Sequence, residues 1–150
     1  MTGGRRPAEY DEPGPSWRAP PPPPPSAEER NTFVALQRFK LAMRFRRKTN
    51  HALQRLGISF AQWRVLEATW RLIRQTGDAV SHLDVSRELD LDEASVSRLM
   101  HVLSKRGWVS HGPDLRFYAW RVFLHDEGKW LVSAGYELVA SVHASCTWGG

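Results

Sequence analysis

Apolar residues recur at helical intervals through most of the chain, and the periodic stretches are bounded by cap residues. Ser26, followed by Glu28 and Glu29, predicts the start of a long helix, and Gly57 predicts its end. A second helix is predicted over residues 60–76. The apolar positions of this second helix are Trp63, Val65, Leu66, Trp70 and Leu72. The pattern is that of a mainly α protein.

Two shorter helices follow, with a tight turn between them. Ser81 is a helix cap, and the first short helix is predicted to run from it to about Leu89. Asp92 caps the second, which is predicted to end at Arg106 before Gly107. Two short helices joined in this way predict a helix-turn-helix motif over about residues 81–106.

A β-rich segment follows the motif directly. Residues 108–110 are predicted to form a strand, residues 111–114 a turn, and residues 118–124 a strand that pairs back with the first. A hairpin that follows a helix-turn-helix is a wing, here over about residues 108–124. The expected fold is therefore mainly α, a winged helix-turn-helix with a long N-terminal helix and a two-stranded β wing.

A last helix is predicted over about residues 126–145, with Gly135 in its middle reducing helix propensity by about 1 kcal/mol. The N-terminal end of the chain has a different character, because nine of the ten prolines lie in the first 25 residues. Such a segment cannot bury enough apolar surface to offset its ordering entropy. We therefore expect a disordered, proline-rich arm over residues 1–26 and one winged-helix domain over residues 27–150.

The positive charge of the chain is concentrated in one segment. The net charge is +5, and residues 31–57 hold seven basic side chains and no acidic one. These basic residues are Arg38, Lys40, Arg44, Arg46, Arg47, Lys48 and Arg55. Such a segment indicates a polyanionic partner, but its sign alone does not distinguish a nucleic acid from a membrane surface.

Several classes of protein are disfavoured by composition. No apolar run approaches the roughly 18 residues of a membrane span. The single cysteine, Cys146, cannot form an internal disulfide and fits a reducing, cytoplasmic compartment. The histidines have no recognised zinc spacing, and the sequence has no nucleophile–base pair, paired carboxylates or phosphate loop. We therefore expect no enzyme activity, no metal and no cofactor.

The helix over residues 93–106 has two contrasting faces. One is apolar and is expected in the core: Val96, Leu99, Met100 and Leu103. The other carries Ala94, Ser97, Arg98, His101 and Lys105. Small and hydroxyl residues followed by arginine suit insertion in a major groove, where Arg98 could pair with guanine. An ordinary solvated helix face is the alternative. Arg116, near the predicted hairpin tip, could enter the minor groove.

Three stretches together resemble the MarR (multiple antibiotic resistance regulator) family of winged-helix transcription factors. The first is GISFAQWRVL, residues 57–66, and the second is LDVSRELDLDEASVSRLMHVLSKRGWV, residues 83–109. The third lies between Asp114 and Gly128 and consists of DLR, residues 114–116, followed by RVFLHDEG, residues 121–128. The resemblance implies that Ser95, Ser97 and Arg98 occupy recognition-helix positions. It also implies that Ser81 and His82, at the start of the supporting helix, contact DNA and that Arg116 is the wing arginine.

The same resemblance implies partners. The family binds pseudo-palindromic duplex DNA as a homodimer, and many members release it on binding a small phenolic ligand. We expect dimerisation through apolar residues of the first and last helices: Phe33, Leu36, Phe39, Met43, Leu131 and Leu138. Because few residues follow Gly128, we expect a short C-terminal helix and a dimer weaker than is usual for the family.

The resulting hypothesis is a sequence-specific, double-stranded DNA-binding transcriptional regulator that represses by occupying a promoter. Two other interpretations remain open. The chain could be a winged-helix module that binds another protein through its first helix. Alternatively, that basic amphipathic helix could bind an anionic membrane surface without spanning it.

Overall fold

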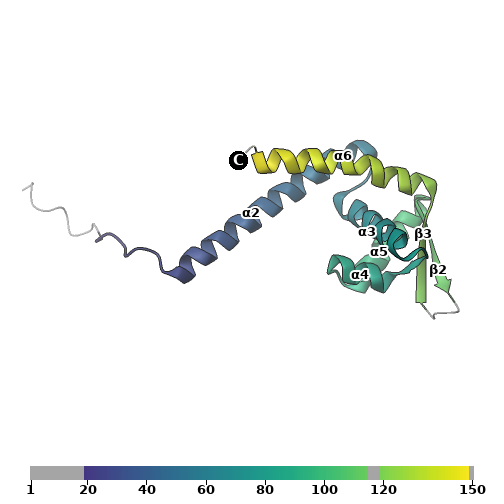
Figure 1. Cartoon of the computed structure of the whole chain (residues 1–150), viewed down its shortest axis with the longest axis horizontal. Coiled ribbons are helices and arrows are strands. Elements are labelled where there is room, and N and C mark those ends of the chain that lie inside the picture. The colour runs from purple at the N-terminus through teal and green to yellow at the C-terminus, as the bar shows by residue number, and fades with distance from the viewer. Residues whose placement is uncertain (1–18, 115–118, 149–150) are drawn as a thin grey trace, which may run out of the picture. The chain divides into compact units, whose positions relative to one another are not determined.

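A computed structural model describes residues 19–114 and 119–148 of the chain (Figure 1). Residues 19–26 have no helix or strand and are exposed. The predicted disordered arm over residues 1–26 falls mainly on residues 1–18, which lie outside the described residues, and it stays a prediction. The chain divides into two units, residues 1–37 and residues 38–150, and the hydrophobic core lies in the second.

The first helix, α2 (Ala27–Leu53), begins directly after its predicted cap and ends at Leu53, before the predicted stop at Gly57. The Ser26 hydroxyl accepts a hydrogen bond from the backbone of Glu29, whose carboxylate accepts one from the Ser26 backbone. A 3₁₀ turn, η1 (Gln54–Leu56), completes the helical segment. Gly57 then takes a left-handed conformation, with φ of 74°, which stops the helix.

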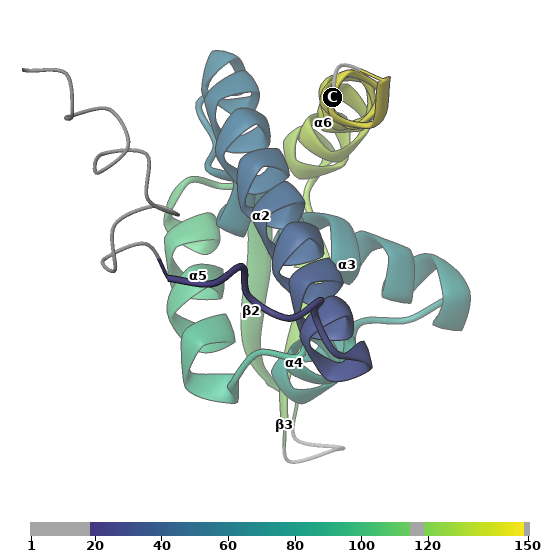
Figure 2. The same ribbon diagram turned by 90° about the vertical axis from the view of Figure 1, so that its left-hand side faces the viewer.

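Helix α3 (Phe60–Thr76) is central to the domain and has the predicted bounds. Ser59 and Gln62 form a capping box at its start. Its buried side, which includes Val65, Leu66 and Ala68, contacts α4, α5, α6 and the sheet (Figure 2). The apolar periodicity of the sequence identified this side correctly.

Helices α4 (His82–Leu89) and α5 (Glu93–Lys105) confirm the predicted helix-turn-helix. The sheet contains β1 (Val80–Ser81), β2 (Val109–Asp114) and β3 (Ala119–Leu124). Its strand order within the described residues is β1-β3-β2, with both pairs antiparallel. The predicted two-stranded wing thus gains a third short strand, which sequence periodicity could not reveal because it spans two residues.

The turn predicted over residues 111–114 is wrong, because β2 continues to Asp114 and pairs with Ala119 of β3. Gly112 and Pro113 suggested the turn. Since β2 is an edge strand, however, Pro113 can lie within it although proline has no N–H group to donate. The connection between the strands is residues 115–118, outside the described residues.

Helix α6 (Asp126–Trp148) begins at the predicted residue and, at 23 residues, extends three residues beyond the expected end at about residue 145. It leaves the end of β3 and packs against α3 (Figure 1). Gly135 lies against Trp63, where an added Cβ would be 1.9 Å from the indole Nε1. Gly135, which lowers the helix propensity of this segment, thus allows α6 to approach α3 closely. No helix within residues 19–114 and 119–148 combines the length and apolarity needed to cross a bilayer.

Candidate nucleic-acid interface

The two helices of the motif are joined by a turn that fixes the angle between them. The Ser81 side chain caps α4, with Asp84 completing a capping box. At the other end of α4, Asp90 adopts a left-handed conformation with φ of 53°. Asp tolerates this region better than most residues do, because its short side chain bonds locally. The Leu91 N–H donates to the Ser86 carbonyl over 2.9 Å, which closes the turn.

The start of α5 is held by a chain of three side chains. Asp92 accepts hydrogen bonds from the Ser95 backbone, at 2.8 Å, and from the Ser95 hydroxyl, at 2.6 Å. These bonds from Ser95 lower the pKa of Asp92, so it is ionised at neutral pH. The Arg98 guanidinium in turn donates to the Ser95 hydroxyl over 3.1 Å. The Arg98 side chain is therefore directed along the first turns of α5.

The two faces of α5 are separated as the sequence predicts. Val96, Met100 and Leu103 are fully buried, and Leu99 packs against this core. The opposite face presents four exposed side chains: Ala94, Arg98, His101 and Lys105. One exposed face with a small residue near the helix start and two cations beyond it suits contact with a nucleic-acid groove.

Four expected contact residues are not among these exposed side chains: Ser81, His82, Ser95 and Ser97. Ser81 is buried at its cap position, and His82 is only 4% exposed. The His82 Nδ1 lies 2.9 Å from the hydroxyl of the half-buried Ser97. Ser81 and His82 thus lie at the start of the supporting helix, as the resemblance implies, and their contact with DNA stays a prediction. They also position α4 and α5, since the His82–Ser97 bond links the two helices.

The histidines lie far apart in the sequence, but the fold brings three of them together: His82, His101 and His111. His82 and His111 stack with ring centroids 5.4 Å apart, and His101 of α5 lies 6.2 Å from His111. Burial lowers the pKa of His82, and the charge of His111 adds to this effect; burial and His101 likewise lower the pKa of His111. Neutral imidazoles thus join α4 and β2. Among the described residues, no His, Cys, Asp or Glu group is arranged to hold a metal ion.

The wing and the dimerisation candidates give mixed results. Arg116 lies outside the described residues, so its minor-groove role stays a prediction. Leu131 is 3% exposed and belongs to the core of this chain, so it cannot face a partner as expected. Leu138 is half-buried against the same core. The four candidates on α2 are exposed: Phe33, Leu36, Phe39 and Met43.

The two tryptophans considered for a ligand crevice differ in their surroundings. Trp63 is buried, and its indole N–H donates to the Leu131 carbonyl over 3.2 Å, so it is a core residue. Trp70 is half-buried and lines a surface hollow of about 300 Å³ together with Arg71, Arg74, Gln75 and Tyr136. Trp70 can therefore contact a bound molecule, whereas Trp63 cannot.

Comparison with known proteins supports the resemblance seen in the sequence. Residues 71–113 match the IclR helix-turn-helix domain. The sequence has no match among the curated proteins compared. The fold is similar to that of a MarR-family transcriptional regulator from Rhodococcus sp. RHA1, with a TM-score of 0.69 and 19% identity. That match covers 79% of this chain and 81% of the other.

Two further similar structures contain DNA. One is a MarR variant from E. coli complexed with operator DNA, with a TM-score of 0.63 and 24% identity. That match covers 78% of this chain and 83% of the other. The other is a MepR–DNA complex from S. aureus, with a TM-score of 0.63, 20% identity and coverage of 80% and 82%. The chain thus has the winged helix-turn-helix fold of MarR-family regulators.

Proposed function

We propose that the protein is a sequence-specific, double-stranded DNA-binding transcriptional regulator that reads the major groove with α5. The observation that carries this proposal is the division of α5 into a fully buried face and an exposed face with Arg98 and Lys105. The helix is anchored at its start by Asp92 and laterally by the His82–Ser97 bond. A rigidly held helix with a free polar face is the feature that groove recognition requires.

Each exposed residue of α5 has a distinct role in this proposal. Ala94 allows close approach at the helix start, and Arg98 donates in a fork to O6 and N7 of a guanine. Lys105 lies nearer the C-terminal end and contacts a phosphate, while His101 lies between the two. Ser95 orients Arg98 through the 3.1 Å hydrogen bond. This role also fits two structures of similar fold, which are DNA complexes of MarR and of MepR.

The proposed mode of action is repression by occupying a promoter, in the cytoplasm, without an enzymatic step. Two recognition helices must lie about one duplex turn apart to read a symmetric operator. We propose that a homodimer sets this distance, with α2 of each copy contributing exposed apolar residues. Phe39 is 64% exposed and Met43 is 42% exposed, and exposed apolar side chains gathered on one helix are typical of an interaction surface. The expectation of a dimer weaker than is usual for the family stays part of this proposal.

A small phenolic ligand that releases DNA is a further part of the proposal. The hollow beside Trp70 has an aromatic wall and the guanidinium group of Arg74, and these suit an aromatic ring with an acidic substituent. Binding there is testable by the quenching of tryptophan fluorescence. A Trp70→Phe variant should lose most of that signal if the ligand occupies this hollow.

Selection of bound fragments from genomic DNA tests the function directly. The proposal expects enrichment of a pseudo-palindromic duplex motif whose half-sites are about one helical turn apart. Random duplexes of equal length serve as the control for non-specific attraction. If no fragment is enriched and the protein instead sediments with anionic liposomes, the membrane-surface interpretation is correct. If neither occurs, the protein-interaction interpretation replaces the proposed function.

A further inference from the structure

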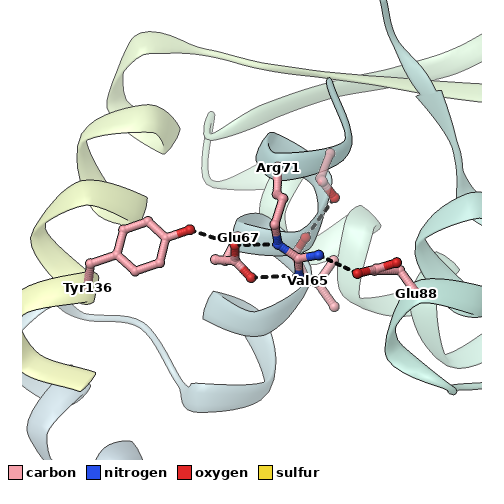
Figure 3. A network of polar contacts seen from close by, with 6 residues as sticks. Val65, Glu67, Arg71, Glu88 and Tyr136 are labelled. Atoms are coloured by element: carbon pink, nitrogen blue, oxygen red, sulfur yellow. Dashed lines mark hydrogen bonds and ion pairs between the residues drawn. The ribbon is translucent and has the colours of Figure 1, made fainter. Parts of the chain in front are cut away.

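A line of four polar side chains connects the last helix to the helix-turn-helix (Figure 3). The Tyr136 hydroxyl of α6 donates to a Glu67 carboxylate oxygen of α3 over 2.6 Å. The Arg71 Nε and Nη2 donate to the two Glu67 oxygens, each over 3.0 Å. The Arg71 Nη1 donates to Glu88 near the end of α4. The line therefore runs from α6 through α3 to α4.

Each member of this line determines where the next one lies. Glu67 is largely buried, with its side chain 13% exposed, and it accepts bonds from both Arg71 and Tyr136. Its two oxygens hold two donors of the rigid guanidinium fork, so the plane of the Arg71 head group is fixed. The remaining Nη1 donor then has one direction in which to meet Glu88. A change at Tyr136 can therefore reach Glu88 although the two side chains do not touch.

The electrostatics agree with this geometry. Burial favours a raised pKa for Glu67, but the bonds from Arg71 and Tyr136 outweigh it and hold the pKa of Glu67 below its ordinary value. Burial, together with the bond to Glu67, raises the pKa of Tyr136 to about 12. At neutral pH the tyrosine is thus a neutral donor, Glu67 a carboxylate and Arg71 a cation. All members of the line are in the states that its hydrogen bonds require.

The two ends of the line differ in how firmly the helices are held. Between α3 and α6, Trp63 donates to Leu131, stacks edge-on with Tyr136 at 5.4 Å, and touches Gly135. This end is closely packed. Between α3 and α4, the apolar core is supplemented by the Arg71–Glu88 ion pair, whose side chains are each 37% exposed. The half-exposed Arg71–Glu88 pair is therefore the link of the line that is less firmly enclosed.

We infer that the Tyr136–Glu67–Arg71–Glu88 line is a positioning network that sets the placement of the helix-turn-helix relative to α6. This inference rests on the proposed function, because α4 carries α5 through the turn and the His82–Ser97 bond. In a dimer, the placement of each α5 sets the spacing of the two recognition helices. The network then affects binding to a complete two-fold site, and does not affect the contacts that one α5 makes with one half-site.

The test compares Tyr136→Phe, Glu88→Gln and the double variant in binding to a full site and to a half-site. Each single variant should weaken full-site binding by about two- to thirtyfold, the range typical of coupling through packed networks. Half-site binding should stay within about twofold. Because both changes interrupt the same line, the double variant should lose no more than the weaker-binding single variant. Losses that multiply, or equal losses on both sites, would overturn the inference.

A control and a DNA-independent measurement separate this inference from the proposed function. Glu137→Gln makes the same charge change on the exposed surface of α6, beside Tyr136, and should leave both sites unaffected. Amide hydrogen exchange of residues 82–89 should be faster in Tyr136→Phe, while that of β3 is unchanged. Unchanged exchange in α4 refutes the network even if DNA binds. Faster exchange in a protein that binds no DNA supports the network and refutes the proposed function.

Discussion

Replacing Gly135 by alanine tests whether close approach, and not helix propensity, determines the residue at this position. In an isolated helix, the change should stabilise by about 1 kcal/mol. In this fold, the added Cβ would lie 1.9 Å from Trp63 Nε1 and 2.6 Å from each of its two neighbouring ring carbons. Real Cβ atoms do not approach other atoms so closely. Either the indole or α6 must therefore move.

The size of the effect follows from what that movement disrupts. Overpacking of a well-filled core costs about 1–3 kcal/mol. Moving the indole also breaks its 3.2 Å hydrogen bond to the Leu131 carbonyl, and a buried donor without a partner costs about 1–3 kcal/mol. After the gain in propensity is subtracted, we expect Gly135→Ala to reduce the free energy of unfolding by about 1–5 kcal/mol.

Urea unfolding followed by circular dichroism measures this change. The exposed Ser133 of α6 supplies a control, because Ser133→Ala should alter stability by no more than a few tenths of a kcal/mol in the stabilising direction. In a Trp63→Phe background, the smaller ring leaves room for the Cβ, so the cost of Gly135→Ala should shrink by at least half. A Gly135→Ala protein as stable as the unmodified one would refute the reasoning.

Three further outcomes are expected. Because the pKa of His82 is lower in the fold than its ordinary 6.5, the unfolded chain takes up protons first as the pH falls. Stability should therefore decrease below about pH 6.5 in thermal melts, and His82→Gln should flatten that decrease. Arg98→Ala should cost about 1–3 kcal/mol on the preferred operator and relax base choice at one position per half-site, as competition assays would show. Equal losses on random duplexes would make Arg98 a phosphate contact. Replacing Phe39 and Met43 by charged residues should give a folded protein that sediments as a monomer. This variant should also lose cooperative binding to a full DNA site. An unmodified protein that is itself monomeric at tens of micromolar would contradict the dimer.

The helices and their inward faces could be predicted because their signals are local. Ser59, Ser81 and Asp92 cap the helices that they precede, and Gly57 ends the first helical segment. The exposed face of α5 follows from the same periodicity. These features depend on residues within a few positions of one another, which a sequence displays directly.

The remaining features depend on contacts between distant segments. His82 and His111 are 29 positions apart and stack through the pairing of elements that no periodicity reports. Leu131 has the apolar character of either a core or an interface residue, and its burial is decided by the packing of α6 on α3. From the sequence, Gly135 is only a weak helix former. Its role in close helix packing is apparent only from the position of Trp63 beside it. Such contacts could be predicted from a set of related sequences, if the two residues of a contacting pair vary together.

The charge distribution leads to a final prediction about the salt dependence of DNA binding. Residues 79–107 carry four basic and five acidic side chains, so the motif itself attracts a duplex weakly. The basic run of residues 31–57 is the segment that supplies the net positive charge. Whether that run contributes to affinity depends on which end of α5 meets the bases.

Recognition helices contact base edges with their N-terminal residues. The opposite end of α5 is fixed by Arg106, whose guanidinium donates to the Gly57 carbonyl over 2.7 Å, just after η1. A helix of 13 residues is about 20 Å long, so Arg55 in η1 lies about two Debye lengths from the base-reading end at physiological salt. We therefore expect the slope of log affinity against log salt to reflect few phosphates, near −4 for a dimer with about two contacts per subunit. Lys105 lies at the same end of α5 as Arg106, but on the exposed face that carries Arg98 and is proposed to enter the groove. Lys105→Gln should therefore make the slope shallower, whereas Arg55→Gln should leave it unchanged. A slope much steeper than −4 that Arg55→Gln reduces would place the basic run on the duplex and refute this orientation of α5.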